Sequence, residues 1–517
     1  MDLAIKIVLL AVFFGVMTGI GLYCRRHATD VSGFVLGGRS VGPWLTAFAY
    51  GTSYFSAVVF VGYAGQFGWK YGVAATWAGL GNAFLGSLLA WVVLGRRTRV
   101  MTQHLDSATM PEFFGKRFDS RALKLCASVI IFIFLIPYTA SLYNGLSRLF
   151  GMAFAIDYSV CVVVMAILTG VYVIAGGYMA TAINDFIQGI IMLAGIAAVI
   201  GAVLHTQGGF LAALEKLARV QGDSGVPGVY ASFFGPDPVN LLGVVLLTSL
   251  GTWGLPQMVQ KFYAIKSEAA ISKGTVISTV FALVVAGGCY FLGGFGRLYA
   301  DRIDIQANGY DSIIPVMLSG LPAILIAVVV ILVLSASMST LSSLVLASSS
   351  TLTLDFIKGN IIKDMDEKRQ VRWMRGLVVV FIAISVVLAL IQYKSSVTFI
   401  AQLMGVSWGA LAGAFLAPFL YGLYWKRTTK AACWVSFVFS AVFMLAVISP
   451  LKTALPPLLQ SPINAGAFCM IAGLVIVPAV SLFTRAPGEK RLEEIFSCYE
   501  RRVTVTVKDS IGEQNSH

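Results

Sequence analysis

The sequence predicts an all-α polytopic membrane protein, and three observations support this prediction. Of the 517 residues, 58% are hydrophobic and only 12% are charged, and the mean hydropathy is +0.83. Soluble domains average about 45–50% apolar and about 25% charged residues, so this chain cannot cover a water-exposed surface. Its apolar runs continue for 20 or more residues without alternation, which excludes a transmembrane β-barrel. The 34 Phe, 19 Tyr and 9 Trp exclude a disordered chain.

Thirteen segments are long and apolar enough to cross a bilayer, because a hydrocarbon core about 30 Å thick takes about 20 helical residues. They cover approximately residues 3–23, 43–65, 72–95, 124–147, 158–177, 185–206, 238–260, 274–296, 319–353, 376–393, 397–424, 431–450 and 463–484. The first span is not typical of a signal peptide, since it lacks a basic leader and precedes Arg25 and Arg26. We expect one transmembrane domain over residues 1–484 and a short cytoplasmic tail over 485–517.

The basic residues predict the orientation of the chain. With the N-terminus outside, the cytoplasmic segments hold 28 of the 37 Lys and Arg and the outer loops hold 8. These cytoplasmic segments include residues 261–273, directly after the seventh span. Since cytoplasmic loops are enriched in Lys and Arg, we expect a multi-pass protein of the cell membrane with its C-terminus inside. The same loops account for the net charge of +13, so no nucleic-acid partner is expected.

No catalytic or nucleotide-binding pattern is present in the sequence. The seven cysteines are scattered without a CxxC pair, and the four histidines fall in loops or at the chain ends. No GxxxxGK[ST] motif occurs. An enzyme or an ATP-driven pump is therefore not expected.

Two spans contain residues that interrupt a helix. The second reads PWLTAFAYGTSYFSAVVFVG, with small and polar residues 51–53 at its middle. The seventh reads LLTSLGTWGLPQMVQ and contains Gly251, Gly254 and Pro256. Backbone carbonyls freed by such breaks must be satisfied by protein, water or an ion. Interrupted helices five spans apart are typical of transporters with inverted repeats and a midplane site, whereas either span alone is also explained by helix packing.

The ninth span carries a polar stripe in the run LSASMSTLSSLVLASSS. Its hydroxyls recur at i, i+4, i+7 and i+8, which places them on one helix face; they belong to Ser335, Ser339, Ser342 and Ser343, with Ala336 and Thr340 beside them. Hydroxyl oxygens suit a small hard cation that must be released in every transport cycle. Hydrogen bonds back to the helix's own carbonyls, or packing between helices, explain the stripe equally well.

A single acidic residue interrupts a long uncharged stretch. Asp185 is the only Asp, Glu, Lys or Arg between Asp157 and Glu215. It is either an N-cap at the membrane interface or a cation ligand at membrane depth.

Seven motifs in order along the chain resemble one transporter family. They are FVLGGRSVGPW (34–44), TSYFSAVVFVG (52–62), KYG (70–72), GGYMATAINDFIQG (176–189), WGLPQ (253–257), SMSTLSS (337–343) and GLYWKR (422–427). The chain resembles the sodium:solute symporter family, and within it the bacterial sodium/proline and sodium/pantothenate symporters. The resemblance implies a LeuT-type core of five plus five inverted helices, with repeats at about 43–206 and 238–424 and extra helices at both ends.

The resemblance also implies a function and an ion site. The expected function is sodium-coupled uptake of a small organic solute that bears a carboxylate, such as pantothenate, an amino acid or a monocarboxylate. The implied sodium ligands are the carbonyls of Thr52, Phe55 and Ala336 and the hydroxyls of Ser339 and Thr340. Sialic-acid symporters bind a second sodium, and the matching residues here are Asp185, Ser339, Ser342 and Ser343. One sodium ion or two per cycle are both compatible with these matches.

The expected substrate pocket departs from the proline pattern. Its implied residues are Ser53, Tyr54, Ser56, Tyr138, Thr252 and Trp253. Tyr54 stands where the sodium/proline pattern has an aspartate and matches a pantothenate-like pattern. Thr248 and Thr252 replace two aromatic positions of the proline site, while Tyr138 matches it. These departures argue against proline as the solute.

Two other classes of function remain open at this stage. The first is a proton-coupled carrier in which Asp185 titrates. The second is a channel or a nutrient-sensing membrane module. The expected partners are sodium, a small solute and the lipid bilayer, and no obligatory protein partner is evident.

Overall fold

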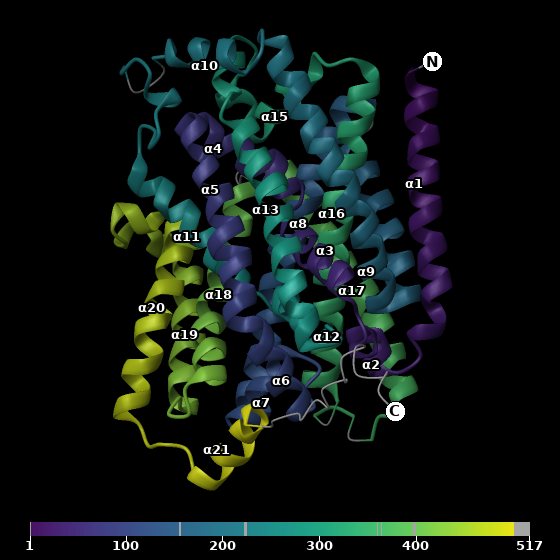
Figure 1. Cartoon of the computed structure of the whole chain (residues 1–517), viewed down its shortest axis with the longest axis vertical. Helices are drawn as coiled ribbons and strands as arrows, with labels where there is room; N and C mark the ends of the chain where they lie inside the picture. The colour runs from purple at the N-terminus through teal and green to yellow at the C-terminus, as the bar shows by residue number, and fades with distance from the viewer. Residues whose placement is uncertain are drawn as a thin grey trace, which may run out of the picture.

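The protein is helical almost throughout, as the sequence predicts (Figure 1). The computed structural model describes residues 2–154, 157–221, 225–358, 360–362, 364–395 and 400–500. Within these ranges the only extended pairings are two isolated bridges, Val41 with Ile265 and Lys358 with Ile362.

Long helices form the body of the molecule. They are α1 (Asp2–Cys24), α8 (Arg121–Phe154), α9 (Tyr158–Thr206), α11 (Pro238–Gly254), α13 (Glu268–Gly293), α16 (Ala323–Thr351), α17 (Glu367–Ser395), α18 (Ile400–Tyr424), α19 (Lys430–Ile448) and α20 (Pro462–Phe483). The shorter helices are α2 (Val31–Leu36), α3 (Pro43–Tyr54), α4 (Ala64–Tyr71), α5 (Thr76–Gly81), α6 (Arg96–His104), α7 (Met110–Arg117), α10 (Phe210–Ala218), α12 (Pro256–Ala264), α14 (Ile305–Asn308), α15 (Ile313–Ser319) and α21 (Glu489–Phe496). Wider π-helical turns form η3 (Val58–Tyr63), η5 (Asn82–Leu89), η6 (Trp91–Gly95) and η11 (Leu352–Ile357).

The number of membrane crossings depends on how the interrupted helices are counted. Ten helical stretches among the described residues are long and apolar enough to cross a membrane, or eleven if the bent pair α11–α12 is one span. Two of the ten, Val58–His104 and Tyr158–Thr206, each contain a glycine outside the helical conformation. Gly72 has φ 62° and ψ −144°, and Gly177 has φ 53° and ψ −147°. The expected thirteen spans divide the chain at these same two glycines, and that number stays a prediction.

Both glycines are required by their backbone conformation and by close packing. A positive φ is costly for any residue with a Cβ. A Cβ on Gly72 would also lie 2.0 Å from the Tyr230 carbonyl oxygen, and one on Gly177 would lie 2.8 Å from the Phe34 carbonyl oxygen. The chain can therefore turn and pack at these two points only with glycine.

Both helices that the sequence marks as interrupted are broken in the structure. Helix α3 ends at Tyr54, Phe55 is extended (φ −93°, ψ 111°), and the chain resumes as a helix when Ser56 Oγ accepts a hydrogen bond from the Val58 amide at 3.2 Å. The pair α11 and α12 bends by 45° at Leu255, and Pro256 begins α12. The first break lies beyond the expected residues 51–53.

The glycines near these breaks serve packing. Gly51 lies inside α3, where a Cβ would meet Phe281 Cδ1 at 2.3 Å. Gly254, at the end of α11, lies so close to α18 that a Cβ would be 2.8 Å from the Ala412 Cα. Small residues at helix contacts let membrane helices approach closely, so the glycines set the spacing of the helices around the breaks.

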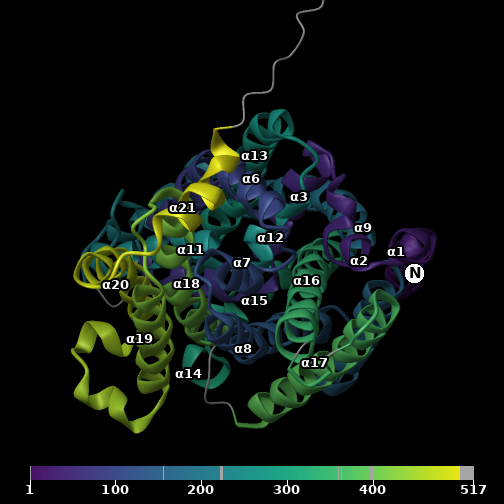
Figure 2. The same ribbon diagram turned by 90° about the horizontal axis from the view of Figure 1, so that it is seen from below.

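The long helices run roughly along the long axis of the molecule (Figure 1). The N-terminal end of α1 lies at one end, while α2, α6, α7 and α21 gather at the opposite end. Seen along the axis, α1, α17, α19 and α20 lie at the periphery and α16 lies further inside (Figure 2). Helix α16 is buried continuously from Leu332 to Thr351, whereas α1 exposes apolar side chains such as Val8 and Val12, so α16 belongs to the core and α1 covers it.

The described part of the expected tail packs against the helices at its end of the molecule. Arg491 pairs with Asp119 at 3.3 Å, and the Tyr499 hydroxyl donates to the Arg97 carbonyl at 3.1 Å. Residues 501–517 lie outside the described part of the chain.

Candidate functional site

Five oxygen atoms, from the end of α3, the extended Phe55 and α16, meet at the break after α3. Ser339 Oγ lies 3.0 Å from the Thr52 carbonyl oxygen and 3.1 Å from that of Ala336. Thr340 Oγ1 lies 3.0 Å from Thr52 O, 3.1 Å from Ala336 O and 3.4 Å from Phe55 O. These are the oxygens that the family resemblance implies as sodium ligands, and the structure brings all five together. We call them the five-oxygen cluster.

The local fold explains why these oxygens are available. The last carbonyls of a helix have no partner four residues further along the chain. Because α3 ends at Tyr54, the carbonyls of Thr52 and Phe55 are free to face α16. The side chains of Ser339 and Thr340 are fully buried, so the cluster is out of contact with bulk water.

Hydroxyls of the polar stripe of α16 bond back to their own helix and also contact a neighbouring helix. Ser339, Thr340 and Ser342 all bond back to carbonyls of their own helix, the last through Ser342 Oγ to Ser339 O at 2.9 Å. Ser339 and Thr340 also reach α3. The stripe is therefore a contact between two helices as well as a row of back-bonded hydroxyls.

Asp185 lies deep inside α9. It is eight residues beyond Gly177 and fully buried. A capping role requires a position at a helix N-terminus, so that alternative is wrong. Neither carboxylate oxygen accepts a hydrogen bond from the described residues.

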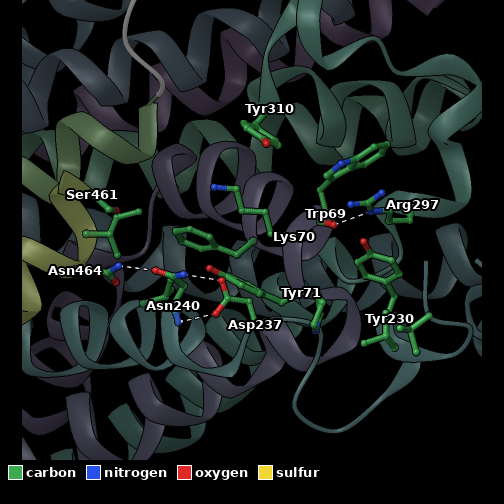
Figure 3. A pocket seen from close by; sticks show the side chains of 16 residues that line it. Trp69, Lys70, Tyr71, Tyr230, Asp237, Asn240, Arg297, Tyr310, Ser461 and Asn464 are labelled. Atoms are coloured by element: carbon green, nitrogen blue, oxygen red, sulfur yellow. Dashed lines mark hydrogen bonds between the residues drawn. The ribbon is translucent and has the colours of Figure 1, made fainter. Parts of the chain in front are cut away.

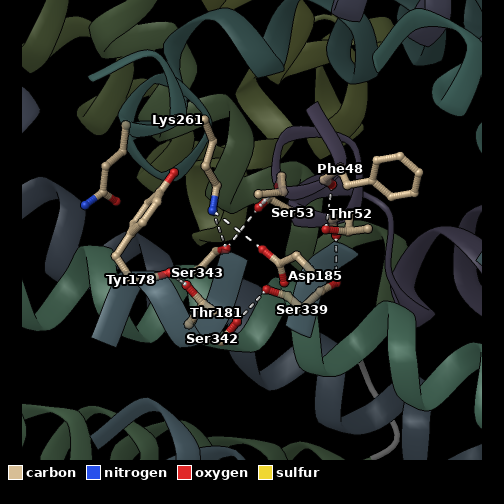
Figure 4. Close-up of polar contacts among 12 residues, drawn as sticks. Phe48, Thr52, Ser53, Tyr178, Thr181, Asp185, Lys261, Ser339, Ser342 and Ser343 are labelled. Carbon is tan, nitrogen blue, oxygen red and sulfur yellow. Dashed lines mark hydrogen bonds and ion pairs between the residues drawn. The ribbon is translucent and has the colours of Figure 1, made fainter. Parts of the chain in front are cut away.

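The ionic partner of Asp185 is Lys261 (Figure 4). Its Nζ lies 3.9 Å from Asp185 Oδ2, donates to Ser343 Oγ at 3.0 Å and lies over the Tyr178 ring at 5.1 Å from the centroid. Ser343 Oγ lies in turn 2.9 Å from Ser53 Oγ. These contacts join α3, α9, α12 and α16.

The position of Lys261 corrects the predicted boundary between the seventh span and the cytoplasmic loop that follows it. Sequence analysis places residues 261–273 in a cytoplasmic loop, whereas α12 continues to Ala264 and leaves Lys261 only 2% exposed. The missed signal is the spacing of Gln257, Gln260 and Lys261 at i, i+3 and i+4, which gives the end of this span one polar face.

Four of the expected substrate residues make hydrogen bonds within the protein through their side chains. Thr252 Oγ1 donates to Gly86 O and Trp253 Nε1 donates to Leu85 O, at 2.8 and 2.9 Å. Ser53 Oγ bonds to Ala49 O and Ser343, and Ser56 caps the helix that follows the break. The polar atoms of these residues are therefore held within the protein. The side chain of Tyr54 lies outside the described part of the structure.

Tyr138 has an aromatic neighbour that the sequence did not indicate. Its ring lies edge-on to Trp408 of α18, with centroids 5.9 Å apart. A Cβ on Gly251 of α11 would lie 2.5 Å from Trp408 Cε3. Trp408 therefore connects α8, α11 and α18 at one point, and no spacing within a single span could reveal that contact.

A cavity of about 650 Å³ opens between α4, α11 and α20 (Figure 3). Lys70, Asp237 and Arg297 give its lining both signs of charge. Asp237 accepts from the Asn240 amide at 3.1 Å, and Asn464 Nδ2 donates to Asn240 Oδ1 at 2.6 Å. The residues that line the cavity come from segments more than 200 residues apart. Sequence patterns therefore did not indicate the cavity.

A bundle of apolar helices, in which a broken helix faces a helix rich in hydroxyls, is typical of secondary transporters. A profile of the Sodium:solute symporter family matches residues 34–438, and the chain belongs to this family. The Sodium/proline symporter of Staphylococcus aureus (strain JH9) is 30% identical over 496 residues, which cover 93% of each chain. The Osmoregulated proline transporter OpuE of Bacillus subtilis (strain 168) is 28% identical over 488 residues, which cover 93% of this chain and 96% of that one.

A solved structure shows the same fold. A substrate-bound, outward-open Na+-coupled sialic acid symporter superposes with a TM-score of 0.73 over 94% of this chain and 99% of that chain. The sequence identity is 15%, so this likeness concerns the fold alone.

Proposed function

We propose that this chain takes up a small proline-like amino acid together with sodium. The five-oxygen cluster is the observation that carries the proposal. Three carbonyls and two hydroxyls are neutral, hard ligands, and the hydroxyl oxygens lie 3.0–3.4 Å from the carbonyl oxygens that they contact. Such a site binds a small monovalent cation without a permanent negative charge to hold it, so the ion is readily released.

The cluster also gives sodium a role in the transport cycle. Thr52 and Phe55 belong to the broken helix, whereas Ala336, Ser339 and Thr340 belong to α16. An ion that contacts both elements stabilises the arrangement in which they are close. A ligand shifts a conformational equilibrium only through such a difference in affinity between two states.

The relatives favour proline over pantothenate. Sequence analysis used Tyr54, Thr248 and Thr252 to argue against proline, but both relatives described above are proline transporters, each aligned over 93% of this chain. Thr252 is hydrogen-bonded within the protein, which reduces its weight as a substrate contact. The pantothenate-like alternative therefore has no support beyond Tyr54.

The charged cavity supports a zwitterionic solute. Lys70 and Arg297 face it beside Asp237, so a solute with one carboxylate and one ammonium group finds partners for both. We assign this cavity as the outer vestibule, and Tyr138 and Trp408 as the aromatic wall of the deeper pocket.

The membrane arrangement completes the proposal. We propose thirteen crossings in one domain over residues 1–484, with inverted repeats at about 43–206 and 238–424 and the N-terminus outside. The basic segments α6, α7 and α21 lie at the end of the molecule opposite the N-terminal end of α1 (Figure 1), which supports this orientation.

Uptake by proteoliposomes tests the function. At fixed pH, labelled proline should accumulate with an inward sodium gradient and not with a choline gradient. Unlabelled proline should compete, and pantothenate or a monocarboxylate should not. Accumulation driven by a proton gradient without sodium would instead establish the proton-coupled carrier, and equilibration without accumulation would establish a channel.

A further inference from the structure

The buried ammonium group of Lys261 lies where a bound cation would be expected. It faces a carboxylate oxygen of Asp185 at 3.9 Å, a hydroxyl oxygen of Ser343 at 3.0 Å and the ring of Tyr178 at 5.1 Å (Figure 4). An ammonium group donates three hydrogen bonds and accepts none. Carboxylates, hydroxyl oxygens and aromatic faces are the groups that hold cations in proteins.

The charges around this group balance without a further ion. Lys261 and Asp185 are 2% and 0% exposed. A buried charge is strongly disfavoured unless it is paired. The nearest opposite charge to each is the other, so the pair is neutral as it stands.

The two oxygens that face Lys261 belong to residues of the second sodium site that the family resemblance implies. Asp185 and Ser343 are shared, while Ser339 and Ser342 direct their hydroxyls to carbonyls. A sodium ion on Asp185 and Ser343 would lie within a few ångströms of the ammonium. Two positive charges at such a short distance repel strongly in a site with little water. A single carboxylate compensates only one of them.

We propose that the Lys261 ammonium is a tethered cation that permanently occupies this second cation site. The inference rests on the proposed sodium symport and deepens it, because it leaves only the five-oxygen cluster for a mobile ion. One sodium ion then accompanies each solute. The alternative of two ions, which the sequence leaves open, is excluded by the chain's own side chain.

The tethered cation also has a mechanical consequence. Lys261 belongs to α12, the second half of the broken helix, while its partners belong to α9 and α16. The contact among these helices therefore does not depend on an ion that leaves in each cycle. Sodium controls the break after α3, and the ammonium holds the inner half of the other broken helix.

Counting bound sodium tests the proposal directly. Purified transporter is equilibrated with radioactive sodium, and the ions bound per molecule are measured together with the sodium-to-solute flux ratio in proteoliposomes. The wild type should bind one ion and transport one ion per solute. Lys261→Met should bind two, because Asp185 and Ser343 are then free, and Lys261→Met combined with Asp185→Asn should return to one.

Two further variants serve as controls. Lys261→Arg keeps the positive charge, and Lys266→Met removes an exposed lysine five residues further along the same segment. Both should bind one ion. Elution as a single species in detergent verifies that each variant is folded.

Two results would overturn the tethered cation: two ions bound by the wild type, or one ion bound by a folded Lys261→Met protein. If Lys261→Met does not fold, the number of sodium ions bound by the wild type still tests the proposal. A wild type that binds no sodium and takes up solute without it contradicts the proposed function instead.

Discussion

At the scale of single residues, the proposed ion site is built from groups that carry no charge. Thr340 Oγ1 lies within 3.4 Å of three carbonyl oxygens, and Ser339 Oγ lies within 3.1 Å of two. Each hydroxyl has one hydrogen to donate, so several of these contacts cannot be hydrogen bonds at the same time. A cation at the centre would satisfy the remaining oxygen lone pairs.

Removing either hydroxyl should weaken sodium binding. Interactions of a polar group with a charge are worth about 1.5 kcal/mol or more, which is roughly tenfold in affinity. We expect Ser339→Ala and Thr340→Ala each to raise the half-saturating sodium concentration for uptake about tenfold. The measurement is the sodium dependence of initial uptake rates in proteoliposomes.

Ser337→Ala is the matched control for this prediction. Ser337 lies on the same helix and is fully buried, but its hydroxyl makes no hydrogen bond to a described residue. Its removal should leave the sodium dependence unchanged. Equal shifts in all three variants would mean that α16 responds to any change of packing and would remove the evidence for a local ion site.

At the scale of helices, the π-helical segment η5 connects the two broken helices through hydrogen bonds. The carbonyls of Leu85 and Gly86 in η5 accept hydrogen bonds from α11, and Gly86 O also accepts one from Tyr50 at 2.8 Å. π-Helical turns often occur at functional sites in helical proteins. Here the segment joins the first half of one broken helix to the first half of the other.

Close packing of α11 on α18 should be sensitive to a single methyl group. In Gly254→Ala the added Cβ would lie 2.8 Å from the Ala412 Cα and 2.8 Å from the Leu416 amide nitrogen. These are backbone atoms that cannot rotate away, so the helices must separate. Overpacking typically costs about 1–3 kcal/mol, and we expect a lower melting temperature in detergent.

The control for this prediction is a helical glycine in open space. A Cβ on Gly201 of α9 would meet no atom within 4 Å. Gly201→Ala should leave the melting temperature unchanged or raise it, since alanine is the better helix former. A similar loss of stability in both variants would contradict the packing explanation.

Individual elements show what sequence patterns can and cannot locate. The existence of both breaks and the polar face of α16 followed from local composition, and the meeting of the five oxygens followed from the family resemblance. The position of the first break did not, because Gly51 is needed for its contact with Phe281 and not for a bend. The Lys261–Asp185 pair also escaped prediction, because its partners lie 76 positions apart and meet only because α9 and α12 both pack against α3 and α16.

At the scale of the whole molecule, the asymmetry of basic residues predicts which end faces the cytoplasm. Lys452 lies in a proposed outer loop and Lys368 at the start of α17 on the proposed cytoplasmic side, and both are exposed. We expect a membrane-impermeant maleimide added to intact cells to label Lys452→Cys and not Lys368→Cys. Lys368→Cys should react only after the membrane is permeabilised.

The native cysteines allow this experiment with one background change. Six of the seven are buried, and only Cys126 is partly accessible. Cys126→Ser should therefore give an unlabelled background. Labelling of Lys368→Cys in intact cells would reverse the proposed orientation.

The proposed outer vestibule and the proposed ion site are formed by different residues, so their effects on transport should separate. Lys70 lines the vestibule, and its ammonium lies 5.2 Å from the centroid of the Tyr310 ring. The Lys70 ammonium attracts the carboxylate end of a zwitterionic solute, and this attraction is screened as the ionic strength rises. Lys70→Met should thus raise the half-saturating solute concentration, by up to about tenfold at low salt and less at high salt.

The half-saturating sodium concentration should stay the same in Lys70→Met, because the five-oxygen cluster is untouched. Lys70→Arg should behave as wild type. A change in sodium affinity with no change for the solute would place Lys70 in the ion pathway and remove its role in solute capture.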